Sequence, residues 1–459
     1  MGIFPLNQTS PQWDVFFFTK LCNMSSETLT KGNGMKVLGI GGGGRESSIG
    51  WKLAESPHIK QMWWAPGNPG IAGERLASNG SLVECVNIGA EDIMTLLQFA
   101  SEKKPDLTVV SSDGPLALGI VDVFQKAGLR IWGPNKKASK LEWSKIYSQE
   151  FMTGYGIPTP EGGWCYTAPV ALAFARRFDG NCFVKLDGLA LGKGALPCKN
   201  VPEAQRIILK IFDEKNFGKG GEGIVIQKRV LGKEISLHLV CDGTNFNLFP
   251  ISRDYKTVGI GDEKNTGGMG AFCPVTIPKI DITRIVKFIL EPWVAGCLKE
   301  GIEFKGILYP SIMLTSDGPQ VLEFNARFGD PETQVYLTRM ETDLLEVIEA
   351  SLAGTIDKVK LMWKPETSVC VVMASGGYPD SKTVGKVITG LDEVDKLPNT
   401  KVFHAGTTLN KDGDVVTSGG RVLGVTSWAI DLETARKQAY LAVEKIKFET
   451  AWCRPDIGQ

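Results

Sequence analysis

The chain has 459 residues, of which 43% are hydrophobic, and its 51 basic and 51 acidic side chains cancel. This length suits three or four domains with large cores. The even charge, without a long basic run, argues against nucleic acid as a partner. No apolar run is long enough to span a membrane, so we expect no membrane association.

The cysteines and histidines further limit the kinds of metal or catalytic site that the chain can form. Ten cysteines are scattered without the C-x-x-C spacing of metal sites, and Cys273, Cys297 and Cys370 lie in apolar contexts. Free, buried thiols are typical of a reducing compartment, so we predict a cytoplasmic location. Only three histidines are present, which leaves little room for a histidine-based zinc site or a catalytic triad.

Residues 1–34 precede the first recognisable domain. Residues 15–18 form an aromatic cluster, which is too short and too polar-flanked for a signal peptide or a membrane span. We interpret residues 1–34 as an extension that is disordered or artefactual, without assigned chemistry.

The first domain begins with an apolar strand over residues 35–40, a glycine-rich turn over 41–46 and a helix that ends near Ser56. A strand, a glycine turn and a helix N-terminus form a cradle for anions. Glu46 stands where a dinucleotide fingerprint has its third glycine, so a phosphate-bearing substrate fits better than NAD. The alternative is that the glycines serve only helix–sheet packing.

Further strands at 61–64, 107–110 and 130–132, with helices between them, predict a parallel α/β domain that ends near Pro134. Residues 111–116 follow one of these strands, at the edge where open α/β sheets bind ligands.

The central region carries lysines beside a glycine-rich loop. We predict one charged helix over 135–154, bearing Lys145, and a strand over 183–185 that ends in Lys185. In the loop 187–194, glycines let backbone N–H groups approach phosphate oxygens while Lys193 supplies charge. This spacing is not that of a Walker loop.

A strand over 223–228 comes next, and residues 230–236 are predicted to form a hairpin with 237–241. With the lysine-bearing strand, the glycine loop and a later Glu-x-Asn strand, this order fits an adenine nucleotide held between two sheets.

The segment 321–325 is that later strand. Glu323 and Asn325 lie on one face of it, because side chains at i and i+2 point the same way. Two hard oxygen donors suit Mg²⁺, which completes its shell with water and phosphate. Arg327 adds a cationic fork on the same face. The alternative is an edge strand with solvated polar residues.

A helix is predicted after this strand, with Asp330 as its cap and Pro331 in its first turn. The strand over 306–314 is expected to pair with the strand that bears Glu323, and residues 281–300 and 344–352 are expected to be helical.

From Pro365 onward the chain predicts a small α+β unit of about a hundred residues. Its strands are expected at 368–373, 401–407 and 419–426, and its helix at 431–447. His404 is either a ligand of the site or a hydrogen-bonded core histidine.

Short motifs lie at residues 43–46, 65–68, 187–194, 265–271, 323–334, 403–407, 419–423 and 453–458. In this order they resemble the phosphoribosylamine–glycine ligase family (glycinamide ribonucleotide synthetases) of the ATP-grasp superfamily, from residue 35 to the C-terminus.

The resemblance implies an ATP-grasp fold in a mixed α/β and α+β multidomain chain. It places an N-terminal parallel α/β (pre-ATP-grasp) domain at 35–135 and the ATP-grasp domain at 136–364. A lid subdomain falls at about 150–228, and a small C-terminal α+β domain at 365–459.

The resemblance also implies a ligase of purine biosynthesis that joins glycine to 5-phosphoribosylamine through glycyl phosphate. The products would be glycinamide ribonucleotide, ADP and phosphate, and the implied cofactors are ATP and Mg²⁺ or Mn²⁺. The partners would be these small molecules alone, bound by a monomer or weak dimer.

Roles for individual residues follow from the resemblance. The catalytic residues would be Arg327, Asp330, Lys193 and Gly268, and the metal ligands Glu323 and Asn325. ATP would contact Lys145, Lys185, Gly188, Leu189, Gly192, Lys193, Gly194, Gln227, Val230, Glu234 and Phe324. The other substrates would contact Gly43, Gly44, Arg45, Glu46, Asn68, Asp254, Lys256, Asn265, Thr266, Gly267, Gly268, Met269 and Arg327.

Some positions depart from the family pattern, among them Ser47, Asp113, Gln227, Tyr255 and Ile260. They lie where the family recognises ribose and the amine substrate, whereas the metal- and phosphate-binding residues match. A ligase with other substrates and a nucleotide-binding paralogue without turnover therefore stay open as alternatives. A dehydrogenase is disfavoured by the missing third glycine.

Overall fold

The computed structural model describes residues 34–189, 194–217, 219–261 and 264–459. Residues 1–33 of the expected extension lie outside this range, as do Gly192 and Lys193 of the expected glycine loop. Among the described helices, none combines the length and the apolar character that crossing a membrane requires.

The N-terminal unit is a parallel five-stranded sheet in the order β3-β2-β1-β4-β5. Its strands are β1 (Met35–Gly41), β2 (Ile59–Pro66), β3 (Glu84–Cys85), β4 (Leu107–Val110) and β5 (Ile131–Trp132). Its helices are α1 (Gly44–Ala54), α2 (Pro69–Ala72), α3 (Ile93–Lys103), α4 (Asp113–Leu118) and α5 (Ile120–Lys126). The predicted parallel α/β unit is confirmed.

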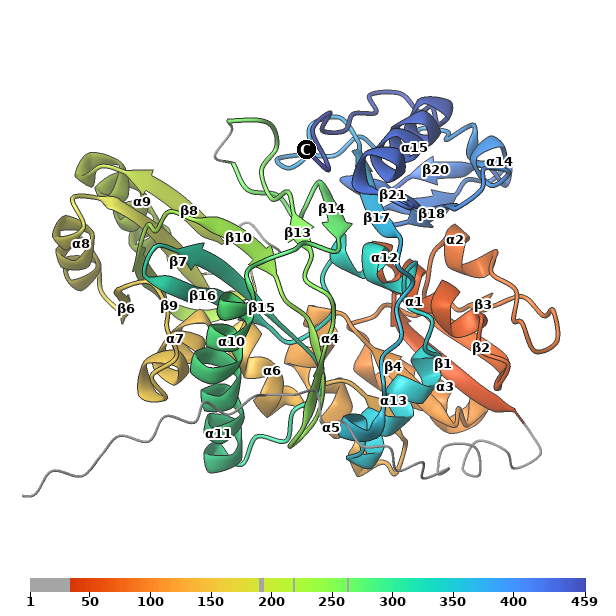
Figure 1. Cartoon of the computed structure of the whole chain (residues 1–459), viewed down its shortest axis with the longest axis horizontal. Coiled ribbons are helices and arrows are strands. Elements are labelled where there is room, and N and C mark those ends of the chain that lie inside the picture. Colours follow the sequence, from red (N-terminus) through yellow and green to blue (C-terminus); the bar gives the residue numbers. More distant parts are fainter. Residues whose placement is uncertain (1–33, 190–193, 218, 262–263) are drawn as a thin grey trace, which may run out of the picture.

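Both faces of this sheet are covered, which explains why its central strands are apolar throughout. Leu38 and Ile40 pack in one cluster with Phe124 of α5. Val37 packs in another with residues far along the chain, such as Leu345. That second cluster includes α12 (Glu332–Leu337) and α13 (Leu344–Ala353), which lie beside α1 and β1 (Figure 1).

A separate antiparallel sheet, in the order β6-β9-β7-β8, forms a second layer. It consists of β6 (Gly162–Cys165), β7 (Asn181–Leu189), β8 (Ala195–Lys199) and β9 (Lys219–Lys228). The helices α8 (Ala168–Arg177) and α9 (Val201–Glu214) share a buried apolar cluster with it. Because β7 continues to Leu189, the first part of the expected 187–194 loop is strand rather than loop.

The central sheet is built on the long hairpin of β15 (Lys305–Thr315) and β16 (Gly318–Asn325). The expected pairing of the strand bearing Glu323 is therefore confirmed. The sheet also contains β10 (Lys233–Ser236), β11 (Leu239–Asp242) and β12 (Phe246–Leu248). The helix expected over 281–300 forms as α10 (Lys279–Ile285), a π-helical turn (Val286–Leu290) and α11 (Glu291–Glu300).

The hairpin expected between residues 230–236 and 237–241 is wrong. Both β10 and β11 pair antiparallel with β15, one after the other along its length, and not with each other. The gap between them lies beside Pro310, which has no N–H to donate to a neighbouring strand. The two segments therefore act as one interrupted strand.

The single helix expected over 135–154 is also wrong. The chain forms α6 (Lys136–Trp143) and α7 (Lys145–Gly154), separated by Ser144 in an extended conformation. The Ser144 hydroxyl accepts a hydrogen bond from the Tyr147 N–H at 3.1 Å, which caps α7. Lys145 consequently lies in the first turn of a new helix.

The C-terminal sheet has the order β13-β14-β17-β21-β18. Its strands are β13 (Arg253–Asp254), β14 (Gly270–Cys273), β17 (Thr367–Ala374), β18 (Thr400–His404) and β21 (Arg421–Ala429). The helices α14 (Leu391–Val394) and α15 (Leu432–Lys445), a 3-10 turn (Ile356–Lys358) and the pair β19 (Thr407–Leu409) and β20 (Val415–Thr417) complete the fold. The two strands that flank the segment 255–269, β13 and β14, thus join the C-terminal unit (Figure 1).

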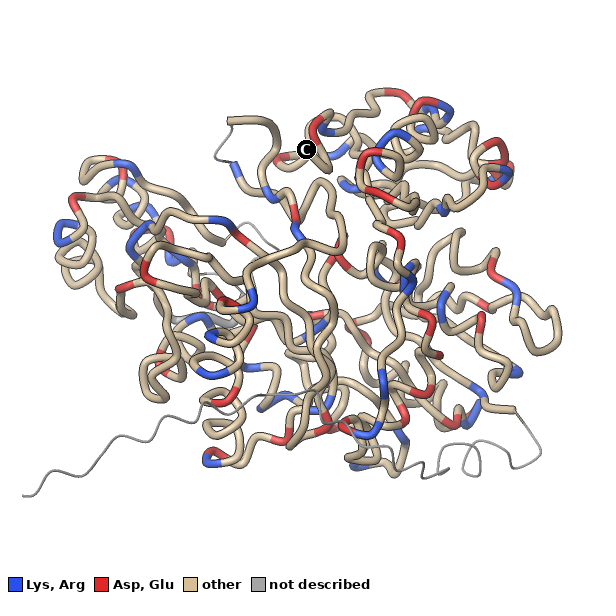
Figure 2. Tube along the Cα trace, viewed as in Figure 1, with Lys and Arg blue, Asp and Glu red and all other residues tan. Residues whose placement is uncertain are grey.

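Charge is distributed evenly over the molecule. Basic and acidic positions are interspersed along the trace in every part of the fold (Figure 2). This agrees with the equal counts of the two kinds of residue.

Candidate active site

A cavity of about 520 Å³ lies between the β6–β9 sheet and the central sheet. Most residues expected to bind ligands line it, namely Arg45, Lys145, Lys185, Gly188, Leu189, Gly194, Gln227, Val230, Glu234, Asp254, Lys256, Asn265, Thr266, Gly267, Glu323, Asn325, Arg327 and Asp330. The cavity therefore collects side chains from segments almost three hundred residues apart.

Glu323 and Asn325 both face the cavity from β16, as their spacing predicts. Lys145, brought there by the first turn of α7, donates to Glu323 Oε2 at 2.8 Å. Burial opposes ionisation of Glu323, but Lys145, Lys256 and Lys185 outweigh it and hold the pKa of this carboxyl well below its usual range. Glu323 is consequently a carboxylate at neutral pH, as a metal ligand must be.

Two further lysines surround this carboxylate. Lys185 of β7 donates to the carbonyl oxygen of Leu322 at 2.8 Å, and burial lowers its pKa to about 8. Lys256 pairs with Glu234 of β10 and donates to Ser311 Oγ at 3.0 Å. Burial alone would lower the pKa of Lys256, but Glu234 raises it well above the usual value. The group of lysines suits a polyphosphate.

Arg327 lies between the metal face and a buried acid. Its guanidinium contacts Glu142 Oε1 at 2.9 Å and donates to Asn325 Oδ1 at 3.1 Å. Its Nε is buried and has no hydrogen-bond partner among the described residues. Burial raises the pKa of Glu142, against the opposing effect of Arg327. An unpaired donor on this cation is suited to an anionic substrate group.

Asp330 does not cap α12, so this expectation is wrong. Its carboxylate instead accepts from Gln334 Nε2 at 2.7 Å and pairs with Arg421 of β21 at 3.0 Å. Burial would raise the pKa of Asp330, but Arg421 and then Arg45 keep it below its usual value. A strong ion pair has replaced the weaker capping interaction.

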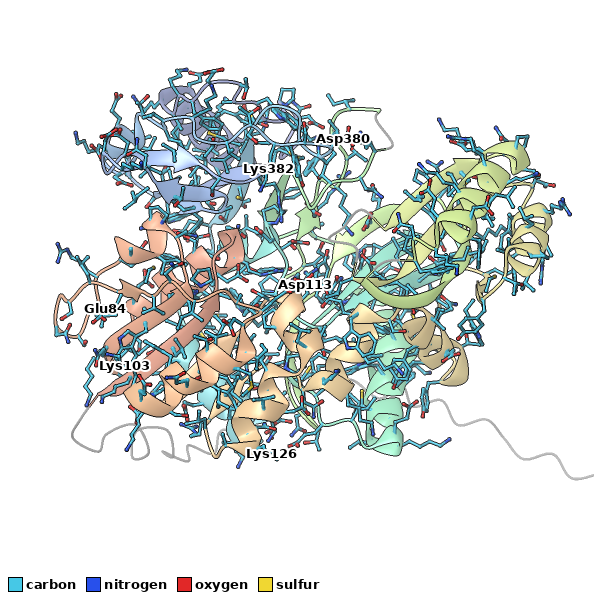
Figure 3. All side chains as sticks on the ribbon, turned by 180° about the vertical axis from the view of Figure 1, so that it is seen from behind. Glu84, Lys103, Asp113, Lys126, Asp380 and Lys382 are labelled. Carbon is cyan, nitrogen blue, oxygen red and sulfur yellow. The ribbon has the colours of Figure 1, made fainter. Side chains whose placement is uncertain are left out.

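The glycine turn after β1 presents Arg45 to the cavity. Arg45 Nε pairs with Glu46 at 2.8 Å, and its Nη2 lies 3.6 Å from Asp113 at the start of α4. Figure 3 labels Asp113, which lies near the middle of the molecule in the view from behind. The Glu46 carboxylate in turn accepts from the Gly43 N–H at 2.9 Å, which holds the turn closed.

Asn68 does not line the cavity, and its side chain instead connects backbone segments of the N-terminal unit and the C-terminal unit. It caps α2 by accepting from the Ile71 N–H, and it donates to the carbonyl oxygens of Gly42 and His404. His404 is buried and its Nδ1 lies 3.0 Å from Thr407 Oγ1, so the hydrogen-bonded alternative describes it.

Several expected contacts lie outside the cavity lining. The lining does not include Gly43, Gly44, Glu46, Asn68, Gly268 or Met269, and the described residues do not include Gly192 or Lys193. Phe324 is fully buried in the core, because it alternates with Glu323 and Asn325 along β16. Its neighbour Leu322 lines the cavity instead.

Three of the positions that depart from the family pattern have hydrogen-bond partners within this chain, whereas Ile260 is exposed. Gln227 is buried and donates to Gln149 Oε1 and Thr159 Oγ1 at 3.3 and 3.1 Å. Ser47 accepts from the His404 N–H at 3.2 Å. The Tyr255 hydroxyl donates to the carbonyl oxygen of Gln459 at 2.8 Å and accepts from the Gly458 N–H.

The sequence alone suggested no role for Glu142 or Arg421, although both line the cavity. Arg421 lies within the motif at 419–423, so a signal for it existed. Glu142 lies in a helix without any motif and had none. Its role depends on the packing of α6 against β16.

The fold and the cavity define an ATP-grasp enzyme. Three matches cover most of the chain: phosphoribosylglycinamide synthetase N domain at 35–142, ATP-grasp (A) domain at 143–333 and C domain at 368–459. The chain belongs to the phosphoribosylglycinamide synthetase family, whose members are also named phosphoribosylamine–glycine ligases.

Individual relatives agree with this family. The chain is 43% identical over 426 residues to a phosphoribosylamine–glycine ligase of Caldanaerobacter subterraneus subsp. tengcongensis, covering 92% of this chain and 99% of the relative. The crystal structure of phosphoribosylamine–glycine ligase from Thermotoga maritima superposes with a TM-score of 0.78 at 32% identity, covering 92% and 99% of the two chains.

A more distant structure shares the fold alone. The biotin carboxylase domain of Hydrogenobacter thermophilus 2-oxoglutarate carboxylase, solved with MgADP and bicarbonate, has a TM-score of 0.69 at 17% identity over 91% of each chain.

Proposed function

We propose that this chain joins the carboxylate of glycine to the amine of 5-phosphoribosylamine at the expense of ATP. The products are glycinamide ribonucleotide, ADP and phosphate. The observation that carries this proposal is the meeting in one cavity of Glu323 and Asn325, a group of lysines, and Arg45 and Arg327. Phosphate-binding groups thus lie beside cations that suit two further anionic substrates.

The nucleotide is assigned to the space between β7–β9 and β15–β16. Lys145, Lys185 and Lys193 would neutralise its phosphates, with Lys193 assigned by the family motif alone. The segment 227–232 lines the far part of the cavity and would hold the base and ribose. Gln227 offers a neutral amide there, fixed in place by Gln149.

A divalent cation fits Glu323 and Asn325. Both present hard oxygen atoms, and the acid is ionised. No group of three or more acidic, histidine or cysteine side chains that could hold a metal occurs in the described part of the chain. A two-residue site completed by phosphate oxygens suits Mg²⁺ better than a fully enclosing site would, and Mn²⁺ is the second candidate. Such an ion would neutralise charge on the phosphates.

Glycine is assigned to the space between Arg327 and Asp254. The unpaired Nε of Arg327 suits its carboxylate. Asp254 Oδ1 is likewise buried without a hydrogen-bond partner among the described residues. Burial and then Glu332 raise the pKa of Asp254 well above its usual value. An ammonium group between these two acids would restore ionisation of Asp254 and satisfy its free oxygen.

Phosphoribosylamine is assigned to the glycine turn and Arg45. The N-terminus of α1 presents backbone N–H groups at this turn, which suits a phosphate. Arg45 points from the turn into the cavity, where the amine must reach the activated glycine.

These placements support a two-step reaction. A carboxylate oxygen of glycine attacks the γ-phosphorus, ADP leaves, and glycyl phosphate forms beside Arg327 and Asp330. The amine then attacks the acyl carbon and expels phosphate. The cations stabilise charge on the transferring phosphoryl group, and a closed cavity protects the acyl phosphate from water.

Oxygen transfer tests this sequence directly. Glycine labelled with ¹⁸O in its carboxylate should deliver one labelled oxygen to each phosphate released. If glycinamide ribonucleotide forms but the released phosphate carries no label, the reaction does not pass through an acyl phosphate intermediate. Release of ADP and phosphate without any requirement for glycine would instead indicate another carboxylate substrate.

The finer assignments are part of the same proposal. The domain limits at residues 135 and 364, a monomer or weak dimer, and a cytoplasmic location follow from the family and from the cysteines. The described cysteines are free, and most of them are buried, which agrees with a reducing environment.

A further inference from the structure

His238 is a buried histidine that the proposed reaction does not use. It lies in the gap between β10 and β11 and has no exposed surface. Its ring stacks on Tyr309 of β15, with ring centroids 4.1 Å apart and planes 20° from parallel. Tyr309 lines the cavity, and its carbonyl oxygen accepts from Asn325 Nδ2 at 3.2 Å. His238 is therefore one layer behind the site.

Both ring nitrogens of His238 are hydrogen-bonded, and the partners decide the tautomer. The Gly329 N–H donates to Nε2 at 3.0 Å, so Nε2 carries no proton. Nδ1 lies 3.0 Å from the Tyr336 hydroxyl and donates to it. Burial and then Arg327 lower the pKa of His238 well below its usual value, so the ring is neutral.

The peptide group held by His238 is bound at its opposite end by two arginines. The carbonyl oxygen of Phe328 accepts from Arg45 at 3.1 Å and from Arg327 at 3.1 Å. The Phe328 carbonyl and the Gly329 N–H belong to one planar peptide group. Fixing the direction of the N–H therefore fixes the carbonyl that aligns both guanidinium groups.

We propose that His238 is a positioning residue for the ligation reaction. Its neutral imidazole orients the Phe328–Gly329 peptide, and this peptide sets the separation between Arg45 on the amine side and Arg327 on the carboxylate side. The inference rests on the function proposed above, and it adds a residue that no motif of the sequence includes.

Two substitutions separate the hydrogen bond from the packing. His238→Phe keeps an aromatic ring against Tyr309 but leaves the buried Gly329 N–H without an acceptor. His238→Gln loses the ring but offers an amide oxygen to that N–H. A residue that only fills space would tolerate Phe better than Gln, whereas a residue that orients the peptide would show the reverse order.

Steady-state kinetics with each substrate varied in turn distinguishes these roles. We expect His238→Phe to raise KM for phosphoribosylamine and glycine about tenfold, the effect of one unsatisfied buried donor, and to change KM for ATP less than twofold. His238→Gln should recover both values to within about threefold of the wild type. Unchanged KM values, with kcat reduced only in proportion to the folded fraction measured by circular dichroism, would overturn the proposal.

The wild-type assay separates failure of this inference from failure of the proposed function. If the wild-type chain forms no product with these substrates, the proposed function is contradicted. The protonation state of the His238 ring can still be measured in that case, and it tests whether His238 accepts the hydrogen bond from the Gly329 N–H. Histidine-selective ¹⁵N labelling at pH 7, with His238→Phe used for assignment, should show a neutral ring protonated at Nδ1. A ring protonated at Nε2, or an imidazolium, would overturn the role of His238 in either case.

Discussion

The Arg421 guanidinium lies 3.0 Å from the Asp330 carboxylate and so joins β21 of the C-terminal sheet to the loop that follows Arg327. The same guanidinium donates to the carbonyl oxygens of Asp330 and Gly267, at 2.6 and 2.5 Å. One side chain of the C-terminal unit thus holds two loops of the active site. The C-terminal unit therefore contributes a side chain to the cavity lining and fixes two of the loops around it.

Replacement of Arg421 should damage catalysis more than folding. Arg421→Lys keeps the positive charge but cannot contact the carboxylate and both carbonyl oxygens together. We expect kcat/KM for glycine to fall at least tenfold in Arg421→Lys and further in Arg421→Ala, measured as ADP release. Arg130→Ala is the matched control, because Arg130 also pairs with an acid at 2.7 Å but is half exposed and does not line the cavity. A kcat/KM for Arg421→Ala equal to that of the control would contradict the account.

Loss of the Glu323 charge should abolish turnover while the fold stays intact. Glu323→Gln keeps the shape of the side chain but removes the carboxylate, so kcat should fall by about a hundredfold or more. The thermal midpoint should fall somewhat, because the lysines that lower the pKa of Glu323 stabilise its ionised form in the folded protein, and circular dichroism checks that the variant is folded at the assay temperature. Glu303→Gln, at an exposed acid, serves as the control. Turnover of Glu323→Gln within threefold of wild type would refute the metal assignment.

Nucleotide binding should take up a proton at alkaline pH. Burial lowers the pKa of Lys185 to about 8, so most of this amine is neutral at pH 9 in the free protein. A bound polyphosphate favours the charged form and raises the pKa, so binding must draw a proton from solvent at pH 9 but not at pH 7. The affinity for nucleotide should accordingly decline as pH rises through 8.

Calorimetry in two buffers with different ionisation enthalpies measures this uptake. With a pKa of about 8, about a tenth of the amine is neutral at pH 7 and about a tenth is charged at pH 9, so we expect the proton uptake at pH 9 to exceed the uptake at pH 7 by about 0.8 proton. In Lys185→Met the proton uptake should not increase between pH 7 and pH 9. Because protonation changes of the nucleotide itself occur in both proteins, subtracting the uptake of the variant from that of the wild type removes them. Equal uptake by wild type and Lys185→Met at pH 9 would contradict a change in protonation of Lys185 on nucleotide binding.

Local patterns in the sequence predicted the parts of the site that depend on neighbouring residues. The alternation of Glu323, Phe324 and Asn325 places two donors on one face of β16, and the structure shows them lining the cavity. The strand–glycine–helix order at 35–54 likewise predicted the first turn of the N-terminal sheet. The alternation of side chains along a strand and the residue types of a turn depend only on a short segment, so a short stretch of sequence is enough to predict them.

Contacts between residues far apart in the sequence determine the features that local patterns failed to predict. Asp330 has the sequence context of a helix cap, but Arg421 is 91 residues away and competes for its carboxylate. The break at Ser144 depends on capping of α7 and on Asp187, whose Oδ1 accepts from the Ser144 hydroxyl at 3.1 Å. No local pattern in the sequence predicts that Arg421 or Asp187 is the partner.

The most direct test is ADP formation with Mg-ATP, glycine and freshly prepared phosphoribosylamine, with each substrate omitted in turn. The proposed function predicts turnover only when all three are present, with formation of glycinamide ribonucleotide in equal amount to ADP. Turnover that is indifferent to phosphoribosylamine would indicate a different amine substrate. No ADP under any condition would contradict catalysis and leave the nucleotide-binding alternative.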